Sequence, residues 1–210
     1  MQHAAAAPRP EAQASSTPRP EAQASSTPRT DTRVRAQQVA LELFAEQGYE
    51  KTSLREIAER LGVTKAALYY HFRSKEDIVH SFTDDHFAAI DSLIDWAKAQ
   101  PPGPDTRREI LDRYVGIVLA NSKVFRFIEQ NRAAMQSMEG KGDRIARFRS
   151  RLDTLADLLA GPAAPLRDRV RATAALFAAT TSCMYFSGTA EDVTDLHDIV
   201  LEIAIDLSER

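Results

Sequence analysis

The sequence has a single cysteine, Cys183, so one chain cannot form a disulfide bond within itself. In a chain of 210 residues, of which 43% are hydrophobic, we interpret this thiol as a small buried apolar side chain and not as a redox sensor. The sequence also lacks a run of about 18 apolar residues, the length of a membrane span. Its N-terminus lacks the apolar segment of a secretory signal. We therefore expect a soluble cytoplasmic protein with no membrane partner.

Motifs of common catalytic sites are missing as well. The sequence has no glycine-rich phosphate-binding loop, no nucleophile elbow and no metal-binding motif. His80, His86 and His197 do not have the spacing of metal ligands, although His80 and His86 share one predicted helix and can meet a residue from elsewhere. We expect a protein that is not an enzyme and that uses neither a metal nor another cofactor.

The first 30 residues differ in kind from the rest. The decapeptide PRPEAQASST occurs at 8–17 and again at 18–27, and the segment has almost no large apolar side chain. Such a segment cannot bury enough surface to fold, and a repeat this short and polar cannot stack as a solenoid. We predict a disordered tail at residues 1–30. Its arginines, Arg9, Arg19 and Arg29, are either weak phosphate contacts or part of a neutral extension.

The stretch from Thr52 to Lys75, TSLREIAERLGVTKAALYYHFRSK, predicts two short helices around a tight turn. Ser53 and Glu56 have the spacing of a capping box, which begins a helix. One apolar face follows at Leu54, Ile57, Ala58 and Leu61. Gly62 can adopt positive φ and should end this helix.

Thr64 is placed to cap the second short helix. Leu68 and Phe72 should point back toward the first helix, whereas Lys65, Ala66, Tyr69 and Tyr70 should face outward. A short helix with small residues near its start and donors along its flank can enter the major groove of DNA. Ser74 then caps a third helix, with Lys75 in its first turn near a helix N-terminus that favours phosphate.

The residues RVRAQQVALELFAEQGYEKTSLREIAERLGVTKAALYYHFRSKEDIV, at 33–79, resemble the N-terminal domain of the tetracycline-repressor (TetR) family of bacterial transcription regulators. The resemblance implies an all-α protein: a three-helix domain with a helix-turn-helix at 31–76, followed by a helical regulatory and dimerisation domain at 77–210. It also implies a repressor whose homodimer binds a palindromic operator in double-stranded DNA, which would associate it with the nucleoid. An effector in the second domain would release it.

The resemblance also implies which residues contact DNA. Arg55 lies where some members read a guanine, Lys75 matches the usual phosphate anchor, and Thr52 and Ser53 lie where hydroxyls contact the backbone. His71 is either a phosphate contact or a residue that packs or caps the end of its helix. The complete predicted set is Thr52, Ser53, Arg55, Thr64, Lys65, Ala66, Tyr69, Tyr70, His71 and Lys75.

The formal net charge of −3 is divided unevenly along the chain. Residues 1–75 carry 11 Lys and Arg against 8 Asp and Glu, whereas the remaining residues carry 16 against 22. The positive end therefore contains the predicted helix-turn-helix. A positive field this small requires dimerisation and specific contacts for useful DNA affinity.

The rest of the chain shows helical periodicity and no strand pattern. After a first helix that begins at Asp31 or Thr32 and stops at Gly48, we expect a long helix from Ile78 to Trp96 that ends before PPGP at 101–104. Further helices are predicted at 110–119, 124–138, 145–159, 170–186 and 193–207. In relatives the last two helices form the dimer interface, although their small residues would also permit close packing within one subunit.

An effector site cannot be located by a motif. Aromatic and sulfur-containing side chains can line an adaptable apolar cavity, although such residues are usually core. The candidates are Trp96, Tyr114, Phe125, Phe127, Met135, Met138, Phe148, Cys183, Met184 and Tyr185. Asn121, Gln130, Asn131 and Arg132 are candidates for orienting a polar group, or are simply solvated or interfacial. We favour an apolar or amphipathic effector. The alternatives are a ligand-dependent activator and a helical protein that sequesters small molecules.

Overall fold

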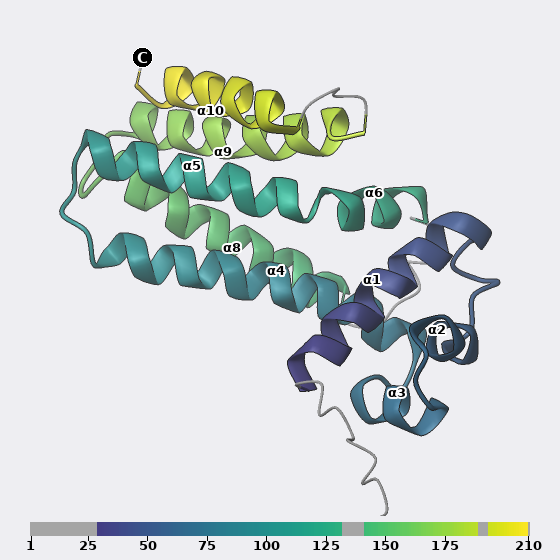
Figure 1. Cartoon of the computed structure of the whole chain (residues 1–210). Coiled ribbons are helices and arrows are strands. Elements are labelled where there is room, and N and C mark those ends of the chain that lie inside the picture. The colour runs from purple at the N-terminus through teal and green to yellow at the C-terminus, as the bar shows by residue number, and fades with distance from the viewer. Residues whose placement is uncertain (1–28, 132–140, 189–192, 210) are drawn as a thin grey trace, which may run out of the picture.

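The computed structural model of the chain describes residues 29–131, 141–188 and 193–209. Within these ranges every regular element is an α-helix (Figure 1), as the sequence predicts. The repeat-containing segment lies outside the described residues except for Arg29 and Thr30, so the disordered tail stays a prediction. No described helix is long and apolar enough to cross a membrane.

Three short-range signals in the sequence set the first helices. Helix α1 (Arg29–Gln47) is followed by α2 (Leu54–Leu61) and α3 (Lys65–His71). The predicted capping box is confirmed, because the Ser53 hydroxyl accepts from the Glu56 N–H and the Glu56 carboxylate accepts from the Ser53 N–H. Gly62 ends α2 in the left-handed conformation, at φ 73°. Thr64 caps α3 through the Ala67 N–H.

Helix α4 (Lys75–Lys98) begins at its predicted cap, Ser74. We call α1–α3 and the first turns of α4 the reader. Their apolar core contains the predicted inward residues Leu68 and Phe72. It also contains Val124 and Phe127, which belong to a helix far along the chain, so the reader core is completed from outside the reader.

The regulatory half comprises the rest of α4 together with α5 (Pro104–Ala120), α6 (Ser122–Gln130), α8 (Lys141–Ala160), α9 (Leu166–Phe186) and α10 (Val193–Glu209). The predicted break at PPGP is confirmed, since α5 begins at Pro104. Figure 1 shows α4 and α8 side by side beneath α5, with α9 and α10 above. The predicted helix at 124–138 is described only as far as α6, because 132–140 lie outside the described residues.

A second hydrophobic core fills the regulatory half. Tyr114 and Cys183 are fully buried there, and the Tyr114 hydroxyl is hydrogen-bonded to that of Thr180 at 2.7 Å. Burial raises the pKa of Cys183 to about 11, so the thiol stays protonated and behaves as the predicted apolar core residue. On α10, Leu196 and Val200 join this core whereas Ile199 and Ile203 are exposed. The apolar residues of α10 therefore divide between a buried face and an exposed face.

Candidate nucleic-acid interface and effector region

Helix α3 presents one buried and one exposed face. Leu68 is fully buried, whereas Tyr69 is 42% and Tyr70 is 71% exposed. Lys65 and Ala66 are exposed beside them, and the Lys65 ammonium lies 5.2 Å from the centre of the Tyr69 ring. Two exposed tyrosines next to an exposed lysine form a surface that can donate hydrogen bonds and stack, without disturbing the packing beneath it.

Helix α2 adds a cation and a hydroxyl to the exposed surface. The Arg55 guanidinium donates to Glu59 Oε1 at 2.7 Å, and this bond raises the pKa of Arg55. Both side chains are well exposed, so the pair is weak and can exchange for another acceptor. The Ser53 hydroxyl is exposed at the start of the same helix while it completes the capping box.

Lys75 is held in place by the turn between α1 and α2. Its ammonium donates to the carbonyl oxygens of Tyr49 at 2.7 Å and Glu50 at 3.3 Å, and it lies 4.5 Å from the centre of the Tyr49 ring. The Tyr49 hydroxyl donates to Glu76 at 2.8 Å, and burial together with this carboxylate raises the pKa of Tyr49. Lys75 therefore joins α4 to the start of the helix-turn-helix, and its charge is fixed in position.

The remaining predicted DNA contacts, Thr52, His71 and Thr64, differ in how far they are exposed. Thr52 is buried, and its hydroxyl donates to the Gly48 carbonyl at 2.9 Å, so it lies beneath the exposed surface rather than on it. His71 is partly buried at the end of α3, with its ring edge-on to Tyr70 at 5.3 Å. Thr64 is exposed at the cap of α3.

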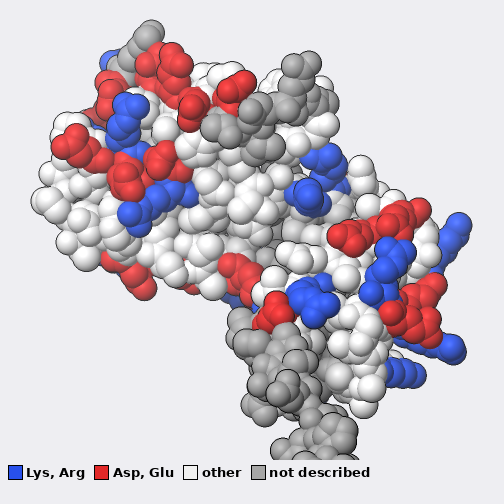
Figure 2. All heavy atoms as spheres, in the orientation of Figure 1, with Lys and Arg blue, Asp and Glu red and all other residues white. Residues whose placement is uncertain are grey.

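Charge on the reader is mixed. Figure 2 shows Lys and Arg side chains projecting from the outer edge of the reader with acidic side chains between them. Ion pairs account for part of this pattern, as in Arg60 with Glu46 at 3.0 Å. Among the described residues, the face visible in Figure 2 therefore carries no continuous positive surface.

The predicted effector residues are dispersed over the regulatory half. Tyr114 and Cys183 belong to its core, and Trp96, Phe125 and Phe148 pack against that core. Met184 is partly buried, and Tyr185 is 75% exposed. Phe127 lies in the reader core instead, stacked on Phe44 with ring centres 5.0 Å apart. Met135 and Met138 lie outside the described residues.

Sequence reasoning missed the most unusual residue of the regulatory half, His86. The sequence raises only the question of whether it is a metal ligand. In the structure its side chain is 3% exposed, and neither ring nitrogen has a hydrogen-bond partner among the described residues. Burial, with a contribution from the charge of Arg151, lowers the pKa of His86 to about 4. The available signal was its place in a helix whose neighbouring positions Phe82, Phe87 and Ile90 are apolar.

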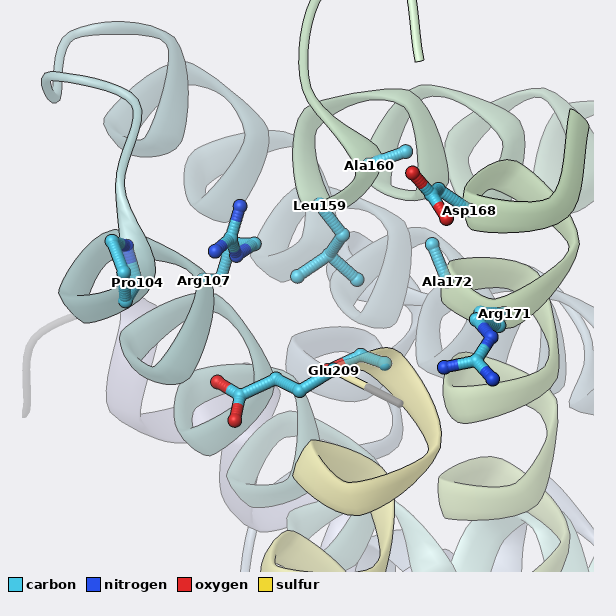
Figure 3. Close-up of a pocket in the computed structure, with 9 residues that line it drawn as sticks. Pro104, Arg107, Leu159, Ala160, Asp168, Arg171, Ala172 and Glu209 are labelled. Atoms are coloured by element: carbon cyan, nitrogen blue, oxygen red, sulfur yellow. The ribbon is translucent and has the colours of Figure 1, made fainter. Parts of the chain in front are cut away.

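A pocket of about 430 Å³ lies at the end of the bundle remote from the reader (Figure 3). Figure 3 shows Arg107 and Arg171 on opposite sides of it, with Asp168 and Glu209 also at its rim and Leu159 among its apolar lining. None of the residues that line it belongs to the predicted effector set. Since two guanidinium groups are matched by two carboxylates, the pocket has no marked preference for an ion of either sign.

A larger groove, about 560 Å³, lies between α1 and α6. Its walls come from α1, with Leu41 and Glu42, and from α6, with Lys123, Arg126 and Phe127. Arg126 also donates to the Ser187 hydroxyl at 3.1 Å, which ties α6 to the end of α9. Helix α6 therefore contacts both halves of the molecule.

Known proteins resemble this chain in the reader. Residues 38–82 match the family model described as bacterial regulatory proteins of the tetR family. The chain is 40% identical over 83 residues to the HTH-type transcriptional regulator AcrR of Shigella flexneri, covering 39% of each protein. It is 31% identical over 113 residues to the HTH-type transcriptional repressor KstR2 of Mycobacterium tuberculosis, covering 52% of this chain and 50% of the relative. The matches thus span half or less of these relatives.

Solved structures extend the likeness to the whole fold. A transcriptional regulator of Aquifex aeolicus superposes with a TM-score of 0.63 at 23% identity, covering 81% of this chain and 96% of that one. PfmR, a TetR-family regulator of Thermus thermophilus, superposes with a TM-score of 0.64 at 21% identity, covering 82% and 96%. At these identities the likeness establishes the arrangement of helices and nothing finer.

Proposed function

Because the chain belongs to the TetR family of bacterial regulators, we propose that it is a one-component transcription regulator and that it is a repressor. Its homodimer binds a palindromic operator through α2 and α3, and a small-molecule effector in the regulatory half lowers its DNA affinity. The observation that carries the proposal is the exposed surface of α3, where Lys65, Tyr69 and Tyr70 project from a helix whose opposite face is buried.

We propose that α3 enters the major groove. Ala66 lets the helix approach base edges, and Lys65, Tyr69 and Tyr70 reach phosphates and bases on either side. Arg55 exchanges its pairing with Glu59 for a guanine, while Ser53, Thr64 and His71 contact the backbone. Lys75 contributes its fixed charge at the N-terminus of α4. Thr52 supports the surface from beneath, through its bond to Gly48.

The proposed dimer interface lies on α9 and α10, which also pack on each other. Large apolar residues of both helices face solvent there, with exposed fractions from 39% to 75%. They are Leu166, Val170, Phe177, Tyr185, Phe186, Ile199, Ile203 and Leu207. Several exposed large apolar residues on two adjacent helices are typical of a protein contact. A two-fold axis through it would present two copies of α3 to successive major grooves, roughly 34 Å apart.

Helix α6 is the proposed route from effector to DNA. Phe125 packs against the regulatory core, whereas Phe127, two residues on, stacks on Phe44 and lies 5.9 Å from Tyr49 in the reader. Tyr49 in turn holds Lys75. A shift of α6 therefore reaches the base of the helix-turn-helix through packed rings. An effector acts only through its different affinities for the two arrangements, and a coupling of roughly 1–3 kcal/mol corresponds to about 5- to 150-fold in DNA affinity.

Capture of fragmented genomic DNA by the purified protein, followed by sequencing, tests the proposal. The chain should enrich a palindrome, and the double variant Lys65→Ala, Tyr69→Ala should not, because it removes two exposed side chains of α3 without altering the reader core. Lys98→Ala, an exposed lysine at the far end of α4, is the charge-matched control and should enrich the same sequence. Equal enrichment by the double variant, or none by the native chain, would contradict the proposal.

A further inference from the structure

His86 is a buried polar group that the fold does not satisfy. It projects from α4 among aromatic rings: Phe125 of α6 lies edge-on to the imidazole at 4.9 Å, and Phe148 of α8 lies at 6.2 Å. Neither Nδ1 nor Nε2 has a hydrogen-bond partner within the described residues. A buried donor or acceptor without a partner is destabilising, and in native proteins such a group calls for a functional explanation.

A second unpartnered donor comes from α8. Arg151 donates through Nη2 to Asp91 at 2.6 Å and through Nη1 to the Arg147 carbonyl at 3.1 Å, but its buried Nε has no partner among the residues described. Its guanidinium lies 4.6 Å from the centre of the Phe87 ring, next to His86 in the sequence, and its charge is felt by His86. Two donors that are unpartnered in the described structure therefore lie among aromatic rings, and one of them belongs to a guanidinium whose charge is paired with Asp91.

We propose that His86 and Arg151 form the polar end of the effector site and that the effector is a carboxylic acid with an apolar body. One carboxylate oxygen accepts from the His86 imidazole N–H and the other from Arg151 Nε–H. The apolar body packs against Phe87, Phe125 and Phe148. A charge-assisted pair of bonds supplies what these buried donors lack, and the rings exclude a fully polar ligand.

In the proposed site the ligand reaches His86 between Phe125 and Phe148. Both rings are only partly buried, whereas His86 and Phe87 behind them are buried. A rotation of Phe125 opens the way to the imidazole, and Phe125 sits on α6 two residues before Phe127. A ligand that displaces Phe125 therefore shifts the same helix that completes the reader core. This part of the inference rests on the proposed function, while binding at His86 does not.

Binding is tested on the full chain with two matched pairs of probes: decanoate against 1-decanol, and 4-phenylbutyrate against 4-phenyl-1-butanol. Calorimetry measures affinity, and NMR of the imidazole Cε1–H follows the protonation of His86. At least one acid should bind more tightly than its alcohol and should raise the pKa of His86, because a bound carboxylate favours the imidazolium. In His86→Phe, which keeps a ring but has no donor, acid affinity should fall by roughly 10- to 100-fold.

His86→Gln, which keeps an N–H donor, should recover part of the acid affinity, and this separates a hydrogen bond from a packing defect. Alcohols that bind as tightly as acids, unchanged acid binding in His86→Phe, or no response of the His86 resonance to either acid would overturn the assignment. Release of captured DNA is read separately. Acid binding at His86 without DNA release would support the binding site and contradict effector control of DNA binding. Loss of DNA capture alone would contradict only the proposed DNA binding by the reader.

Discussion

The reader and the regulatory half begin their helices in different ways. In the reader, α2, α3 and α4 each start at a serine or threonine whose side-chain oxygen accepts a backbone N–H. In the regulatory half, α5, α6 and α9 start without such a bond. A side-chain cap fixes a helix start through neighbours in sequence. The reader geometry is therefore set locally, whereas the regulatory helices depend on packing between helices, which a ligand can change.

Two buried polar residues illustrate the contrast, although the Nε2 of His80 in the second turn of α4 also has no partner in the described structure. In the reader, Gln37 donates to the Ser81 hydroxyl at 2.8 Å and to Asp85 at 2.6 Å, so its buried amide is satisfied. In the regulatory half, His86 is as deeply buried and has no partner in the described structure. A satisfied buried network holds one arrangement. An unsatisfied group leaves free energy to be gained on binding, which suits a half of the molecule that responds to a ligand.

The largest expected effect comes from disrupting the proposed dimer interface on the regulatory half. Phe177→Glu places a carboxylate at each side of the proposed two-fold interface, and burying it unpaired costs at least about 3 kcal/mol, or a roughly 100-fold weaker dimer. Sedimentation should show monomers and palindrome capture should be lost. Ile145→Glu, at an exposed apolar residue of α8, should remain a dimer. A dimeric Phe177→Glu variant would contradict the interface.

The next largest effect tests the packing of α6 against the reader. Phe127→Ala removes a buried ring from the reader core and should lower the free energy of unfolding by about 3–5 kcal/mol. Hydrogen exchange should show lost protection in α1 as well as α6, because the ring stacks on Phe44. Phe125→Ala, at a partly exposed ring of the same helix, should cost less and leave α1 protected. Unchanged exchange in α1 would show that α6 is not part of the reader core.

A moderate effect is expected from pH, and it is specific to the regulatory half. His86 takes up its proton at pKa about 4 when folded and near the ordinary 6.5 when unfolded. Between these values the unfolded chain binds the extra proton, so stability decreases as pH falls. We expect a loss of about 2 kcal/mol from this group between pH 7 and pH 5.

Urea unfolding of the native chain and of His86→Phe at both pH values measures this loss. His80, whose pKa burial also lowers, contributes equally to both proteins and cancels in their difference. Between pH 7 and pH 5 His86→Phe should lose less stability than the native chain, by the expected amount. The same pH dependence in both proteins would mean that His86 is hydrated and not buried.

The smallest effect concerns a local signal in the reader. Ser53→Ala removes the cap of α2 and its bond to Glu56, and should cost about 1 kcal/mol. Ser150→Ala, at an exposed position within α8, should be neutral or slightly stabilising, since alanine favours helix interiors. Thermal unfolding of both variants makes the comparison, and equal melting temperatures would argue against local control of α2.

The same contrast explains what the sequence could reveal. The caps at Ser53, Thr64 and Ser74 and the left-handed turn at Gly62 depend on neighbours in sequence, so they could be predicted, as could the exposed face of α3. The position of Phe127 could not, because its stacking on Phe44 joins segments far apart in the chain. The burial of Thr52 and the bonds of Lys75 to the turn before α2 also arise only from packing.

The mass of the complex with DNA is the most direct test of the account as a whole. Sedimentation equilibrium of the full chain on a captured palindrome, and on a duplex with one half-site scrambled, counts the chains bound to each. The account predicts two chains on the palindrome and clearly weaker binding to the scrambled duplex, because a locally fixed reader acts in pairs joined by α9 and α10. One chain bound with equal affinity to both duplexes would contradict it.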